Sequence, residues 1–68
     1  MLIGENIKQL RKSKGLTQES FANETGISRS YLSDLENNRK SPTIETLEKI
    51  AIKMNTSLKF LIGGSETM

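Results

Sequence analysis

The sequence predicts a single all-α domain of five short helices. Apolar residues recur at helical spacing, no stretch alternates apolar and polar residues, and capping residues and glycines mark the helix ends. Residues 1–62 form the predicted domain, and residues 63–68 form a short flexible C-terminal tail. A chain of 68 residues buries a small fraction of its surface, so a second copy would help to stabilise it.

The first helix is expected over about residues 3–14. Ile3, Ile7 and Leu10 lie on one face at helical spacing. Gly15 follows a basic last turn, which is typical of a helix end.

The second and third helices are expected on either side of Gly26. Thr17 is placed to cap the second helix, and Ser28 is placed to cap the third, which runs to about Glu36. Gly26 adopts a positive φ at no steric cost, so a tight turn between the two helices is expected there.

The fourth and fifth helices follow a loop over residues 37–42. Pro42 marks a boundary or opens the fourth helix. That helix is expected to bury an apolar stripe made of Ile44, Leu47, Ile50, Ala51 and Met54. Ser57 is placed to cap a last helix over residues 58–62, which Gly63-Gly64 ends.

The composition argues against several classes of function. The chain contains no Cys and no His, so thiolate metal sites are excluded and the commonest metal ligand and general base are missing. It has no glycine-rich phosphate loop, no apolar run of about 20 residues and no signal-peptide pattern at its start. We expect a cytoplasmic protein that is not an enzyme, without a metal, cofactor, membrane partner or small-molecule ligand.

The excess of positive charge lies in the first forty residues. Residues 1–40 contain seven Lys/Arg and five Asp/Glu, whereas residues 41–68 contain three of each. The cations cluster before the second helix and again at Arg39-Lys40. Such clusters fit a nucleic-acid partner, although solvated helix faces would carry the same residues.

The spacing of residues 18–36 predicts a helix-turn-helix. Two helices that cross at a steep angle need a small residue where they meet, a left-handed residue in the turn and apolar anchors on the second helix. Counted from Gln18, these requirements are met at the fifth, ninth, tenth, fifteenth and eighteenth positions by Ala22, Gly26, Ile27, Leu32 and Leu35. A generic helical hairpin would meet only one or two of them by chance.

The outward face of the third helix is short and polar. It presents Arg29, Ser30 and Ser33, with Asp34 at its margin and Asn37 just beyond. A face without bulky apolar groups suits insertion into the major groove of double-stranded DNA, which admits a helix. The alternative is an ordinary solvated helix face.

The run IKQLRKSKGLTQESFANETGISRSYLSDLENNRKSPTIETLEKIA resembles the phage Cro and repressor type of helix-turn-helix regulator, the xenobiotic-response-element family. The resemblance covers roughly residues 3–62. It implies a compact five-helix domain of the lambda-repressor-like type, usually a homodimer, that binds an operator with dyad symmetry. We expect a transcriptional repressor; the alternative is an antitoxin or protein-interaction module.

The resemblance also implies roles at the DNA bases. Arg29 and Ser30 match the family's main base-reading positions, and Arg29 suits paired hydrogen bonds to guanine, with a phosphate contact as the alternative. Ser33 lies on the same face. Asp34 matches a position that reads bases, either by accepting from cytosine N4 or by orienting Arg29 or Ser30.

Further residues are expected at the DNA backbone. In the family, a Gln at the position of Gln18 bonds a phosphate and braces the recognition helix, and Arg11 and Glu36 resemble an ion pair that leaves Arg11 a candidate for phosphate as well. For Tyr31, a buried ring and an outward hydroxyl stay open as alternatives. The other expected backbone contacts are Ser28, Asn37, Arg39 and Lys40.

A second, apolar surface is expected on the last two helices. Ile52 lies about 140° from the centre of the fourth helix's apolar stripe, at a position that is usually polar in the family. Leu58 and Leu61 take the inward positions of the last helix, which leaves Phe60 and Ile62 partly outside. We expect a homodimer through Ile52, Phe60 and Ile62, with recognition helices one DNA turn apart, about 34 Å.

Overall fold

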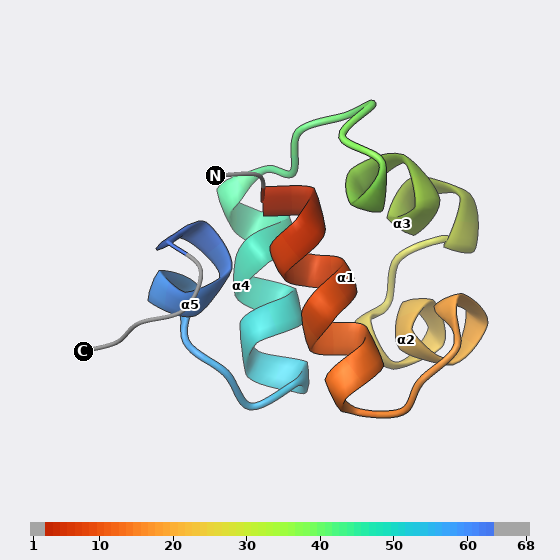
Figure 1. Cartoon of the computed structure of the whole chain (residues 1–68), viewed down its shortest axis with the longest axis horizontal. Helices are drawn as coiled ribbons and strands as arrows, with labels where there is room; N and C mark the ends of the chain where they lie inside the picture. The colour runs from red at the N-terminus through yellow and green to blue at the C-terminus, as the bar shows by residue number, and fades with distance from the viewer. Residues whose placement is uncertain (1–2, 64–68) are drawn as a thin grey trace.

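The computed structural model describes residues 3–63, which form five helices (Figure 1). The helices are α1 (Ile3–Ser13), α2 (Gln18–Thr25), α3 (Arg29–Glu36), α4 (Ile44–Lys53) and α5 (Leu58–Gly63). The all-α prediction is confirmed, although α1 ends one residue earlier and α5 one residue later than expected. Residues 64–68 of the predicted tail lie outside the described residues.

Side-chain caps and one glycine produce the α2–α3 unit. Thr17 Oγ1 accepts a hydrogen bond from the Ser20 N–H at 3.1 Å, and Ser28 Oγ accepts one from the Tyr31 N–H at 3.0 Å. Gly26 lies between the helices with a φ of 78°. Both predicted caps and the predicted turn are therefore confirmed.

The core draws on all five helices. Its largest fully buried apolar side chains are Ile7, Phe21, Leu32, Leu35, Ile50 and Leu61. Ala22 is buried on α2, which packs against α3 and α4, while α1 packs against α3 and α5. In Figure 1, α3 and α5 lie at opposite ends of the molecule.

The expected burial of Ile44 is wrong. Thr43 caps α4 by accepting from the Thr46 N–H at 3.1 Å, so Ile44 is the first residue of the helix and is 61% exposed. At 100° per residue, Ile44 lies about 70° from the centre of the buried stripe. Ile44 therefore lies at the edge of the stripe in the first turn of α4, where its side chain stays exposed to solvent.

The start of α1 approaches the end of α3 closely. A Cβ atom at Gly4 would overlap the Leu35 carbonyl oxygen and lie 2.6 Å from Asn38 Oδ1. Asn38 has a φ of 58°, and its Oδ1 accepts a hydrogen bond from the Gly4 N–H at 3.2 Å. This contact holds the loop after α3 against α1.

Candidate nucleic-acid interface

The outer side of α3 is polar and exposed. Arg29 and Ser30 are exposed, whereas Leu32 and Leu35 on the opposite side are buried. Within residues 3–63, Arg29 makes no ion pair. Its guanidinium is therefore available to an external acceptor.

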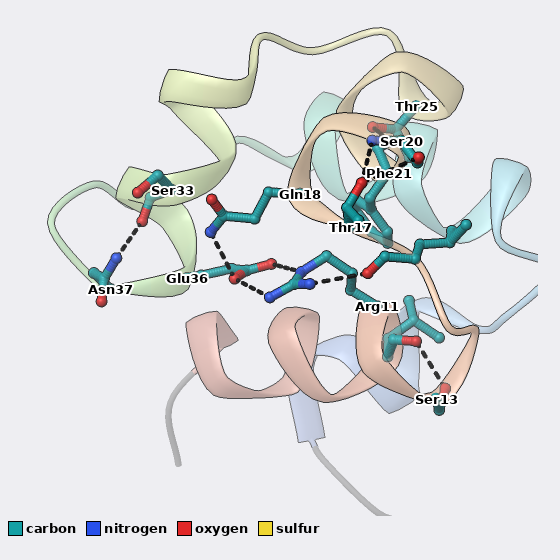
Figure 2. A network of polar contacts seen from close by, with 12 residues as sticks. Arg11, Ser13, Thr17, Gln18, Ser20, Phe21, Thr25, Ser33, Glu36 and Asn37 are labelled. Atoms are coloured by element: carbon teal, nitrogen blue, oxygen red, sulfur yellow. Dashed lines mark hydrogen bonds and ion pairs between the residues drawn. The ribbon is translucent and has the colours of Figure 1, made fainter.

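Both ends of α3 carry exposed polar caps. Ser28 caps the N-terminus, and Asn37 Nδ2 donates to the Ser33 carbonyl oxygen at 2.9 Å near the C-terminus (Figure 2). Ser28 and Asn37 are exposed, and Ser33 is half-buried. These bonds fix the helix ends that flank the polar face.

Tyr31 lies on the side of α3 that faces the core. Its side chain is half-buried against the core, and its hydroxyl lies 3.5 Å from Thr46 Oγ1 on α4. The ring therefore belongs to the packed side of the helix. A phosphate contact by its hydroxyl stays a prediction.

A buried polar network joins α1, α2 and the end of α3 (Figure 2). Arg11 donates from Nε to Glu36 Oε2 at 2.7 Å and from Nη2 to Glu36 Oε1 at 3.1 Å. Gln18 Nε2 donates to Glu36 Oε1, also at 3.1 Å. The predicted Arg11–Glu36 pair is confirmed, and Gln18 braces the same carboxylate.

The charged pair of this network is almost fully enclosed by protein, whereas Gln18 is half-buried. The Glu36 side chain is 2% exposed and that of Arg11 is 11% exposed. Arg11 Nη1 also donates to the Leu16 carbonyl oxygen at 2.9 Å. Because the buried charges and their donors are matched, the network fixes the end of α3 relative to α1 and α2. A phosphate contact by Arg11 stays a prediction.

A second ion-pair cluster lies on the surface after α3. Arg39 Nε lies 3.0 Å from Asp34 Oδ1, and Lys40 Nζ lies 3.7 Å from Asp34 Oδ2. Among residues 3–63, the ion pairs of Asp34 are with Arg39 and Lys40 and not with Arg29. Sequence reasoning missed this pairing because it depends on the path of the loop after Glu36. Base reading by Asp34, or an orienting role towards Arg29 or Ser30, stays a prediction.

The expected dimer residues differ in exposure. Ile52 is 76% exposed and Ile62 is 46% exposed, whereas Phe60 is half-buried and packs against the core. Ile44, which was expected inside, is a further exposed apolar residue of α4.

Sequence reasoning also missed Gly4 and Asn38. Asn is one of the few residues that tolerate positive φ, so the Asn37-Asn38 pair was the available signal for a left-handed residue. Nothing in the sequence pointed from Asn38 to Gly4, which lies 34 residues earlier.

No metal or membrane site emerges from the part of the chain that the structure describes. Residues 3–63 contain no group of three or more His, Cys, Asp or Glu side chains that could hold a metal ion. None of the helices described there has the length and apolar character needed to cross a membrane.

Two known proteins are similar to this chain in sequence. The immunity repressor protein of Bacillus phage phi105 is 38% identical over 63 residues, which cover 93% of this chain and 44% of the relative. The antitoxin PezA of Streptococcus pneumoniae is 45% identical over 98% of this chain and 42% of its own length. This chain thus spans less than half the length of either relative.

The fold also matches a solved structure. The crystal structure of SinR, the master regulator for biofilm formation, in complex with DNA superposes with a TM-score of 0.85 and 39% identity. The match covers 90% of this chain and 98% of that one.

The family model described as helix-turn-helix matches residues 7–61, in agreement with the expectation that the chain is not an enzyme. The chain therefore belongs to the helix-turn-helix family of phage-repressor type.

Proposed function

We propose that this domain binds operator DNA as a homodimer, with α3 in the major groove, and represses transcription. The observation that carries the proposal is the exposed polar side of α3, where Arg29 has no ion pair within residues 3–63. A helix in the major groove needs such a face, and Arg reads guanine through paired hydrogen bonds. The DNA in the SinR structure supports the proposal by similarity.

Base reading is assigned to Arg29, Ser30 and Ser33. Arg29 and Ser30 occupy the first turn of α3, which is the part of a recognition helix that contacts base edges. Asp34 is a weaker candidate because both of its carboxylate oxygens face cations of the same chain.

Contacts with the DNA backbone are assigned around both ends of α3. Gln18 and Ser28 lie at the starts of α2 and α3, and Asn37, Arg39 and Lys40 follow the end of α3. Helix N-termini and cations are common phosphate partners, and such contacts set register without reading sequence. Arg11 and Tyr31 are weaker candidates, because the Arg11 side chain is only 11% exposed and the Tyr31 ring packs against the core.

The dimer is assigned to Ile52 of α4 with Phe60 and Ile62 of α5, and not to the exposed Ile44 in the first turn of α4. Ile52 and Ile62 are the exposed members of the predicted interface, and Phe60 supports it from the edge of the core. A second copy would cover these side chains and present two recognition helices to a near-palindromic site.

A selection of binding sites from random DNA tests the function. The expected result is an enriched sequence with dyad symmetry and half-sites about one helical turn apart. The logarithm of the binding constant should fall linearly with the logarithm of salt concentration, because phosphate contacts release counterions. If no sequence is enriched over bulk competitor at low salt, the operator-binding proposal fails.

Sedimentation of Ile52→Ser tests the dimer. The variant should be monomeric at concentrations at which the wild-type chain is dimeric. Ile44→Ser is the matched control, because Ile44 is an exposed isoleucine of the same helix outside the proposed interface. A persistent dimer in Ile52→Ser would move the interface elsewhere.

The similarity to PezA favours one second candidate, an antitoxin whose helix-turn-helix serves autoregulation or partner binding. Partner binding without DNA binding would give no enriched sequence and no measurable affinity for duplex DNA. The random-sequence selection therefore separates a pure partner-binding module from the repressor, whereas an autoregulatory antitoxin would also enrich an operator sequence.

A further inference from the structure

The loop after α3 turns two cations back onto one carboxylate. Each oxygen of Asp34 faces a different cation: Oδ1 lies 3.0 Å from Arg39 Nε and Oδ2 lies 3.7 Å from Lys40 Nζ. Arg39 Nη2 also lies 3.4 Å from Ser33 Oγ. The arrangement places an internal anion among the cations that follow the proposed recognition helix.

The backbone of the loop builds this arrangement. The N–H groups of Arg39 and Lys40 both donate to the Asp34 carbonyl oxygen, at 2.8 and 3.4 Å. The turn passes through Asn38 at a φ of 58°, and the bond from Gly4 holds the Asn38 side chain. The two cations are therefore brought to Asp34 by the fold of the loop, and not only by the rotamers of their long side chains.

The cluster is open to exchange with an outside anion. The side chains of Arg39 and Lys40 are 59% and 62% exposed, and that of Asp34 is 24% exposed. Carboxylate and phosphate oxygens accept hydrogen bonds from guanidinium and ammonium groups in similar ways. An exposed ion pair contributes little net stability, so a phosphate can replace the carboxylate at small cost.

We infer that Asp34 competes with DNA phosphates for Arg39 and Lys40, and thereby lowers the sequence-independent affinity of this domain for DNA. The inference rests on the proposed DNA-binding function. Asp34 lowers the net charge of the three side chains from +2 to +1, and its carboxylate occupies both cations. A phosphate contact by Arg39 or Lys40 then requires that cation to give up its ion pair with Asp34.

Competition differs from base reading by Asp34 in its consequences. A base-reading carboxylate contributes to the preference at one base pair, so its removal relaxes that preference. A competing carboxylate acts equally on every sequence, so its removal strengthens binding to all of them and leaves the base preference unchanged.

The test compares Asp34→Asn with the wild-type chain on a mixed-sequence DNA duplex of about two helical turns, titrated at several salt concentrations. The expected result at low salt is an affinity gain of up to about fivefold per chain, the fold-change that corresponds to the upper end of the range for an exposed ion pair. The slope of log K against log salt should steepen by about 0.9, as for one additional phosphate contact. Unchanged or weaker binding by a folded Asp34→Asn variant would overturn the inference.

The same substitution in an Arg39→Gln/Lys40→Gln background separates competition from general repulsion. If Asp34 acts through these cations, the affinity gain disappears in that background. A gain that persists would show that Asp34 simply repels DNA and would overturn the inference. Glu19→Gln removes an exposed acid of α2 that makes no ion pair within residues 3–63, and it should change the affinity by less than about twofold.

Two further readouts keep the inference and the proposed function apart. A changed base preference in a selection with Asp34→Asn would assign Asp34 to base reading and overturn competition. Failure of the wild-type chain to bind any duplex would overturn the DNA-binding function and the inference together. An unfolding midpoint close to that of the wild type confirms that the variant is folded.

Discussion

Glu36 and Asp34 lie two residues apart on α3, and cations from other segments meet both carboxylates. Glu36 is 2% exposed and pairs with Arg11, whose side chain is 11% exposed. Asp34 is 24% exposed and pairs with Arg39 and Lys40, both more than half exposed. The residue types are alike, but one pair lies between helices and the other faces solvent.

The difference shows that burial, and not the type of ion pair, decides what each carboxylate does. An uncompensated charge in a protein interior costs several kcal/mol, so Glu36 and Arg11 are locked together (Figure 2). An exposed pair contributes about 0–1 kcal/mol, so the cations near Asp34 are free to exchange partners. The first cluster therefore positions α3, and the second modulates what α3 and its loop bind.

The largest expected effect comes from breaking the buried pair. Glu36→Gln removes the charge that compensates Arg11 and should lower the free energy of unfolding by about 3 kcal/mol. Denaturant unfolding monitored by circular dichroism measures the change.

Asp34→Asn is the matched control for that substitution, because it removes a carboxylate from the same helix at an exposed pair. Its unfolding free energy should stay within about 1 kcal/mol of the wild-type value. Equal losses in the two variants would contradict the division between a structural and a modulating cluster.

A smaller loss of stability is expected from separating α1 and α3. Gly4→Ala places a Cβ against the Leu35 carbonyl oxygen and Asn38, and should cost about 1–3 kcal/mol through overpacking. Thermal unfolding checks this value. Gly63→Ala is the control, since a Cβ there meets nothing within 4 Å. If both variants melt like the wild type, the close approach of α1 and α3 does not constrain the fold.

The smallest effect is expected from the exposed cluster itself. Lys40→Ala should weaken binding to all DNA sequences alike and reduce the magnitude of the salt slope by about 1. Titrations on two unrelated duplexes at several salt concentrations measure both quantities. A loss confined to one sequence would show that Lys40 takes part in base reading.

Local signals predicted most of the fold. Thr17, Ser28 and Gly26 act within one or two turns of chain, so their caps and turn could be read from spacing alone. The apolar anchors of α3 and the Arg11–Glu36 pair followed from the helix-turn-helix pattern and the family resemblance.

Contacts that depend on loop paths could not be predicted. Gly4 meets Asn38 across 34 residues, and Asp34 meets Arg39 only because the loop turns at Asn38. Periodicity also failed for Ile44, since an apolar residue at the edge of a stripe is buried only if another helix covers it. The spacing of apolar residues within one helix does not show which of them another helix will bury.

Selection of binding sites with the Arg29→Ala variant tests most directly whether the outer face of α3 reads DNA. The expected outcome is a preference relaxed at one base pair of each half-site, with a loss of about 1–3 kcal/mol on the wild-type site. Lys40→Ala, selected in parallel, should retain the wild-type preference. A base preference that survives the loss of Arg29 unchanged would contradict the assignment of base reading to this face.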